Sequence, residues 1–225
     1  MSSTTNAGST LPRSALARSG AAVTIARMSI GRRRLLAFLV FLAASLILAS
    51  LGPSERVLGP SARVVYLHGA WVWTALISFA AAAAVGLAGL LGRGEGLHRW
   101  STGWARSATL FWLTSLLFSL WAMETSWNGL YLAEPRWRLG VQFGVVAILL
   151  QLAILLIRRP PVASAVNVAF FAALALALLT AESVLHPSAP IAASGWDLVR
   201  LFFLGLLVTS SLAAWQLAGL LRPRW

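Results

Sequence analysis

The stretch that decides the fold is residues 64–91, "VVYLHGAWVWTALISFAAAAAVGLAGLL". It holds no charged residue and shows no alternation of polar and apolar positions. At about 1.5 Å per residue, a helix of this length spans about 42 Å, more than the roughly 30 Å hydrocarbon core of a bilayer. A continuous apolar run predicts a membrane-crossing helix rather than a strand of a β-barrel. Its small residues, "SFAAAAAVGLAGLLG", predict a face for close helix packing.

The rest of the chain repeats this pattern. Of 225 residues, 59% are hydrophobic and 11% charged, which is too apolar for an ordinary soluble domain. We therefore predict an all-α fold, an integral membrane bundle of six transmembrane helices that forms one domain over residues 35–222. The predicted helices cover about residues 35–51, 64–91, 104–123, 139–157, 162–181 and 198–221.

The N-terminal segment differs from this domain in composition. Residues 1–34 are small, polar and basic, and we expect them to form a disordered basic cytoplasmic tail. Met28 is an alternative start to Met1. The run 35–51, which follows three arginines, resembles a secretory signal peptide in outline. It is longer than the usual apolar region of about 7–15 residues, which favours a retained first helix.

All 18 basic residues are arginines, and the chain has no cysteine. Without thiols it forms no disulfide and no CxxCH heme attachment. A net charge of +12 also occurs in nucleic-acid-binding proteins, but these arginines stand at the ends of the apolar runs and in the tail. No known nucleic-acid-binding module accompanies them. We expect the lipid bilayer and its anionic headgroups, and no nucleic acid, as their partners.

The arginines also predict the orientation. With the N-terminus inside, five arginines fall outside and the other thirteen inside, in line with the positive-inside rule. Both termini are then cytoplasmic, as in a multi-pass protein of a bacterial inner (plasma) membrane. The outer arginines are Arg56, Arg63, Arg136, Arg138 and Arg200. Five acids, Glu55, Glu124, Glu134, Glu182 and Asp197, fall outside, and Glu95 inside.

Two of the three histidines fall on the outer side. His68 begins the second predicted helix, His186 follows the fifth, and a tryptophan-containing loop connects the third and fourth. Two neutral imidazoles on different helices are suited to ligate one heme iron, while interfacial histidines in an aromatic belt produce the same pattern. His98 is expected in the cytoplasmic loop, apart from both.

The outer loop also offers charged groups. Glu134 and Arg136 form either a local surface ion pair or a site in which an arginine faces a ligand carboxylate. No serine, cysteine or carboxylate pair has a base at a workable spacing, and no three metal ligands cluster. The sequence therefore does not predict an enzyme.

Three segments stand out together: "RVVYLHGAWVW" (63–73), "LWAMETSWNGLYLAEPRWRL" (120–139) and "VNVAFFAALALALLTAESVLHPSAP" (166–190). Together they resemble the heme-handling membrane proteins of cytochrome c assembly, and most of all the six-helix heme-delivery member of that family. The positions that match are His68, Trp73, Trp121, Trp127, Arg136, Asn167, Leu185 and His186, with Glu134 in place of an aspartate. The chain departs from the family at Ala70, which replaces a proline, and at Leu130, Tyr131 and Ala133, which replace tryptophans.

The resemblance implies a heme b site at the outer face. His68 and His186 would ligate the iron, and a reduced platform would consist of Trp121, Trp127, Tyr131 and Arg136. The protein would present heme to a heme chaperone or transfer it, beside other membrane subunits of a cytochrome c assembly or redox complex. The lost tryptophans keep open a cofactor-free structural or accessory subunit with the same fold. The permease half of an exporter is a third reading, although the chain shows no coupling helix.

Overall fold

The computed structural model describes residues 13–55, 58–92, 94–182 and 197–224, with the side chains of the first helix described from residue 30 onward. This part of the chain folds into six α-helices and contains no strand beyond one isolated bridge, so the predicted all-α fold is confirmed for it. The helices are α1 (Arg13–Ser50), α2 (Ala62–Leu90), α3 (Glu95–Trp127), α4 (Pro135–Ile157), α5 (Pro160–Thr180) and α6 (Asp197–Leu220).

Five of these helices are long and apolar enough to cross a membrane: α2, α4, α5, α6 and the Ile30–Ser50 part of α1. The molecule is therefore a multi-pass membrane protein. Proline opens two of the spans, at Pro135 and Pro160, where its missing N–H leaves no intrahelical bond unmade. Arg158, with a positive φ of 52°, ends α4 and allows α5 to turn back beside it.

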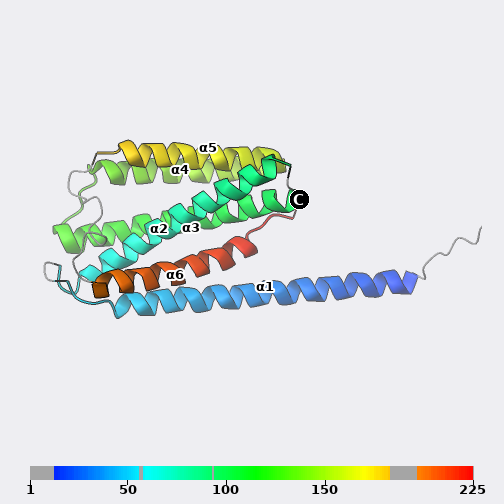
Figure 1. Cartoon of the computed structure of the whole chain (residues 1–225), viewed down its shortest axis with the longest axis horizontal. Helices are drawn as coiled ribbons and strands as arrows, with labels where there is room; N and C mark the ends of the chain where they lie inside the picture. The colour runs from blue at the N-terminus through cyan, green and yellow to red at the C-terminus, as the bar shows by residue number, and fades with distance from the viewer. Residues whose placement is uncertain (1–12, 56–57, 93, 183–196, 225) are drawn as a thin grey trace, which may run out of the picture.

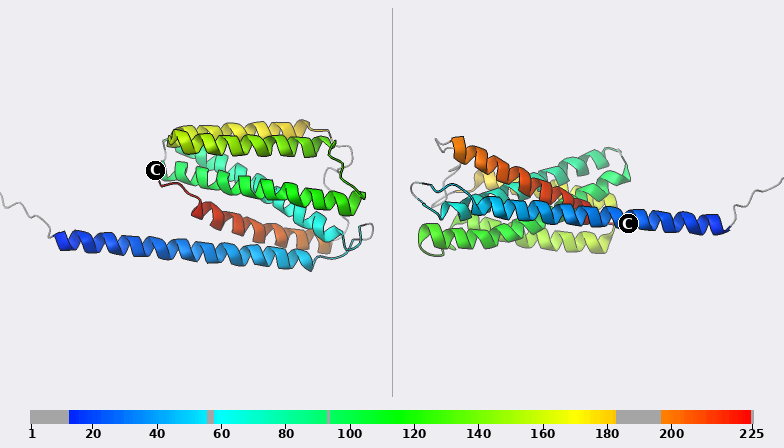
Figure 2. Two further views of the ribbon diagram at one scale, coloured as in Figure 1. Left: turned by 180° about the vertical axis from the view of Figure 1, so that it is seen from behind. Right: turned by 90° about the horizontal axis from the view of Figure 1, so that it is seen from below.

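The helices form three layers (Figure 1). The pair α4 and α5 lies on one side, α2 and α3 occupy the middle, and α1 and α6 lie on the other side. The view from behind shows the same order (Figure 2). Since the helices alternate in direction, the chain enters and leaves at one end of the bundle, which we call the terminal end. The ends of α1, α3 and α5 and the starts of α2, α4 and α6 lie at the other end, which we call the distal end.

The first helix is longer than predicted. Because α1 begins at Arg13, the expected disordered tail is wrong for residues 13–34, whereas residues 1–12 lie outside the described part. The segment 13–50 contains no proline and is rich in alanine, leucine and arginine, which are strong helix formers. The polar segment therefore continues the membrane-crossing helix, and α1 extends beyond the bundle at the terminal end (Figures 1 and 2).

The third helix also exceeds its predicted range of 104–123, and it is not among the five apolar spans. It carries several serines and threonines, which lower its hydropathy. Ser101 donates a hydrogen bond to the Ala82 carbonyl of α2 (2.8 Å), and Ser107 donates to the Ala214 carbonyl of α6 (2.9 Å). Because α3 packs against α2, α4, α5 and α6, these two hydroxyls are satisfied by neighbouring helices, while Thr109 and Ser115 donate to carbonyls of α3 itself.

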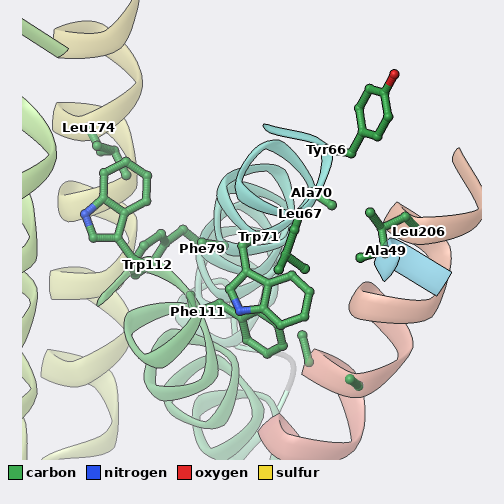
Figure 3. Packing of buried hydrophobic residues seen from close by; sticks show 14 of the residues in the cluster. Ala49, Tyr66, Leu67, Ala70, Trp71, Phe79, Phe111, Trp112, Leu174 and Leu206 are labelled. Carbon is green, nitrogen blue, oxygen red and sulfur yellow. The ribbon is translucent and has the colours of Figure 1, made fainter. Parts of the chain in front are cut away.

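Aromatic side chains fill the space between α2 and α3 and between α2 and α5 (Figure 3). Trp71 of α2 packs on Phe111 of α3 with ring centroids 5.3 Å apart. The ring centroid of Phe79 on α2 lies 6.3 Å from that of Trp112 on α3 and 4.9 Å from that of Phe170 on α5. The contact between Phe79 and Phe170 connects the middle layer to α5.

The small-residue face predicted on α2 is confirmed. Ala75, Ala82 and Gly86 are buried, and α2 is the most buried of the candidate spans. Small side chains allow neighbouring backbones to approach closely, which is how helices associate where water supplies no driving force.

A polar network lies near the terminal end, where His98 was expected in a loop. His98 is instead in the first turns of α3 and buried, and its Nδ1 lies 2.7 Å from the Ser164 hydroxyl of α5. One turn farther along, Asn167 of α5 donates to the Ser101 hydroxyl at 3.0 Å. The helix starts earlier than its apolar run because Glu95, in the first turn, suits the positive end of the helix dipole.

Candidate functional site

A cavity of about 130 Å³ lies between α2, α3 and α4 near the distal end. Its walls come from the start of α2, the last turns of α3, the start of α4 and one residue of α5. The lining residues are His68, Val72, Trp112, Ser115, Leu116, Ser119, Met123, Trp127, Glu134, Arg136, Trp137, Gly140 and Leu178.

His68 is half-buried and faces this cavity from α2. Its Nδ1 lies 3.2 Å from the backbone carbonyl oxygen of Ser115 on α3. A carbonyl oxygen only accepts, so Nδ1 carries the hydrogen, and in the neutral ring Nε2 is the basic nitrogen. Donation from Nδ1 to a backbone carbonyl is the usual way in which a protein orients a histidine that ligates metal through Nε2.

Three indoles line the same cavity as His68. Trp112 is buried, and its Nε1 donates to the Gly140 carbonyl of α4 at 2.9 Å, which ties α3 to α4 at the bottom of the cavity. Trp127, in the last turn of α3, and Trp137, in the first turn of α4, are half-buried. The cavity therefore has an aromatic lining that a flat, apolar ligand could contact.

Two charged residues lie beside the indoles. Glu134 is only 1% exposed and immediately precedes the first turn of α4, where the helix dipole stabilises negative charge. Arg136 is half-buried, and its Nε is buried without a hydrogen-bond partner among the described residues. A buried guanidinium N–H without an acceptor costs free energy, so this position favours a ligand with an acceptor oxygen.

The structure brings together three of the six residues proposed from the sequence: His68, Trp127 and Arg136. Trp121 is 53% exposed and Tyr131 is 41% exposed, and neither lines the cavity. The structure therefore does not bring these two residues to the cavity, and their place in an aromatic platform stays a prediction. His186 lies outside the described residues.

The geometry of α3 explains why Trp121 does not line the cavity with Trp127. Because α3 continues through Trp127, the two tryptophans are six residues apart on one helix and point about 120° apart. The sequence prediction ended this helix at residue 123, which left Trp127 in a loop and its direction open.

Sequence reasoning missed most of the cavity wall. On α3 the missed residues recur at intervals of three or four positions, which is one helix face. This spacing was a usable signal, because the predicted helix 104–123 already contained these positions. The residues of this face are Trp112, Ser115, Ser119 and Met123. On α4, Trp137 and Gly140 were also missed.

No group of three or more histidine, cysteine, aspartate or glutamate side chains suited to a metal ion occurs in the part of the chain that the structure describes. No protein-family model, no curated protein and no solved structure matches this chain.

Proposed function

We propose that this protein is a heme-handling factor of cytochrome c assembly in a bacterial inner membrane. The observation that carries the proposal is the convergence of His68, Trp127 and Arg136 on one cavity, although they come from three different helices. Trp112 and Trp137 line the same cavity and compensate for the tryptophans that the outer loop lacks.

We propose six membrane crossings with both termini in the cytoplasm, which places the cavity toward the outer face. The distribution of arginines supports this orientation, since the terminal end carries most of them. The sixth crossing would be α3, whose buried polar side chains include Ser101, Thr102, Ser107 and Ser115. The distal end would then face the compartment in which c-type cytochromes are assembled.

Each residue has a distinct role in this proposal. His68, with Nδ1 held by the Ser115 carbonyl, would offer Nε2 to the iron, and His186 would be the other protein ligand. Arg136 would pair with a propionate, which supplies the acceptor that its buried Nε lacks among the described residues. Trp127 and Trp137 would contact the ring. Heme b, when bound, would supply the iron that the histidines hold.

The cavity volume limits how heme would be held. About 130 Å³ is less than the roughly 300–1,000 Å³ of pockets that enclose drug-sized ligands. The half-buried His68, Trp127 and Arg136 would hold one edge of the porphyrin, and the rest would remain outside the cavity. A partly exposed heme suits transfer to a heme chaperone beside other membrane subunits.

A second candidate function is a cofactor-free accessory subunit of a larger membrane complex. The small cavity and the outward-facing Trp121 and Tyr131 favour it. In this case His68 would serve only to connect α2 to α3 through the Ser115 carbonyl.

An absorption spectrum distinguishes the two. The full chain, produced with ample heme and purified in a mild detergent, is expected to show the Soret band of a six-coordinate heme. His68→Ala and His186→Ala should abolish that spectrum. Arg136→Gln should weaken heme affinity about tenfold because it removes a charge-assisted hydrogen bond.

The chain offers a matched control for the arginine. Arg138→Gln removes the same charge two residues away, at an exposed position that does not line the cavity, and should leave the spectrum and affinity unchanged. A protein made with ample heme that shows no Soret band, or one whose band survives His68→Ala, would favour the accessory subunit.

A further inference from the structure

A second group of charged side chains lies at the terminal end, far from the cavity. It gathers around Trp100 of α3 and comes from three segments: Arg34 from α1, Arg99 from α3, and Arg222 just after α6. The guanidinium carbon of Arg222 lies 4.2 Å from the centroid of the Trp100 ring, and that of Arg34 lies 5.5 Å from it. We call Arg34, Arg99 and Arg222 the arginine cluster.

The packing of the backbone is adapted to this cluster. Gly219 of α6 has no side chain at the point where the Arg34 guanidinium lies, and any Cβ there would overlap it. Arg106 lies about two turns after Arg99 on α3. It donates a hydrogen bond to the Leu221 carbonyl at 3.1 Å and so fixes the backbone that carries Arg222. Arg34 differs in this respect from its neighbours Arg32 and Arg33, which are exposed.

The cluster has little internal compensation for its positive charge. Glu95 is the one acid at the terminal end among the described residues, and it lies 3.7 Å from Arg99 with its side chain 83% exposed. Burial, followed by the charges of Arg34 and Arg99, lowers the pKa of Arg222. Three like charges held together favour binding of an anion.

Buried hydrogen-bond donors in the cluster also favour binding of an anion. Nη1 of Arg34 and Nε of Arg99 are buried and have no hydrogen-bond acceptor within the described ranges. Arginines that only mark the membrane boundary extend separately toward water, where such groups are hydrated. Here Arg34 and Arg222 converge on one indole, and Arg34 and Arg99 leave buried donors that require an acceptor.

We propose that the arginine cluster binds a phosphate group, either on the headgroup of an anionic phospholipid or as free phosphate. Guanidinium groups bind phosphate oxygens through paired N–H donors. The position also suits a lipid, because the next turns of α1 expose apolar side chains that could contact the acyl chains. These side chains are Leu35, Leu36, Leu39 and Val40.

The test measures ligand-dependent stability of the full chain in a neutral detergent. Phosphatidylglycerol, phosphatidylcholine and inorganic phosphate are titrated separately while the melting temperature is followed at constant ionic strength. We expect phosphatidylglycerol to raise the melting temperature saturably, and the Arg34→Gln/Arg222→Gln double variant to weaken that binding at least about tenfold. A comparable rise in melting temperature with inorganic phosphate would identify free phosphate as the ligand. A rise with phosphatidylglycerol but not with inorganic phosphate would identify the lipid headgroup.

The control removes two equal charges from the same end of the molecule. The Arg158→Gln/Arg159→Gln double variant changes exposed arginines between α4 and α5, away from Trp100, and should keep the affinity of the wild-type protein. Arg34→Lys/Arg222→Lys retains the charge without the paired donors and guards against misfolding, and it should bind at an intermediate strength. Saturable binding of neither phosphatidylglycerol nor phosphate, or an equal loss in the 158/159 control, would overturn the proposal.

Discussion

Single polar side chains hold the buried helices together at the terminal end. Asn167 is 4% exposed, and its amide connects α5 to α3 through Ser101, whose hydroxyl in turn donates to the Ala82 carbonyl of α2. Three helices are thus joined through two hydrogen bonds. Asn167 also matches the family motif, but here it lies near the opposite end of the bundle from the cavity.

We predict that Asn167→Ala lowers the free energy of unfolding by about 1–2 kcal/mol, because it removes an interhelical hydrogen bond where lipid offers no replacement. Unfolding in a detergent titration, followed by circular dichroism, measures the change. Thr180→Ala is the control, since Thr180 is exposed and bonds only within its own helix. Equal stability of the two variants would contradict this role for Asn167.

The directions of single side chains also explain why the candidate site was only partly predictable. His68 and Trp127 could be placed on one side of the membrane by counting apolar runs. Whether two side chains on that side meet depends on the direction in which each helix turns them. The sequence placed Trp121 with the site, while the structure turns it outward and brings in Trp137 instead.

Between whole helices, α3 approaches α6 closely at Gly103. A Cβ at this position would overlap the backbone carbonyl oxygen of Ala218 and lie 2.8 Å from Cγ of Arg222. Since a backbone carbonyl cannot move alone, any side chain here forces the two helices apart.

We predict that Gly103→Ala lowers the free energy of unfolding by about 1–3 kcal/mol, the usual cost of overpacking. Gly96→Ala, on the same helix, meets no atom within 4 Å and should be neutral or stabilising by about 0.5–1 kcal/mol, because alanine favours the helix. Thermal melting of both variants in detergent makes the comparison. Similar stability of the two would show that α3 and α6 are not held this closely.

The order and number of helices were predictable because each apolar run is long enough to require a helix. The residues at which the helices begin and end were less predictable. Apolar runs mark the part of a helix that lies in the membrane, while polar residues at both ends of α3, and the polar segment 13–34 of α1, continue the same hydrogen-bonded backbone.

For the whole molecule, the main prediction concerns its six crossings and orientation. The chain has no cysteine, so single cysteines report accessibility without a background. Gly96→Cys and Leu132→Cys lie at exposed positions beyond opposite ends of the membrane-embedded part of α3. In intact spheroplasts a membrane-impermeant maleimide should label residue 132 and should label residue 96 only after permeabilisation.

This experiment also decides whether α3 crosses the membrane. Labelling of both residues from the same side would show that it does not. The reverse pattern, with residue 96 labelled in intact spheroplasts, would show that the termini lie outside and would remove the support for heme handling at the outer face.

The class of the fold followed from the order of residues alone, because a charge-free run such as 64–91 must form a helix when its backbone has no water to bond. The meeting of His68 with Trp127 and Arg136, and of Arg34 with Arg222 over Trp100, was decided only by tertiary structure. His68 and the carbonyl that orients it are 47 positions apart. Such contacts depend on the rotation and tilt of packed helices, which side-chain volumes across several helices determine jointly.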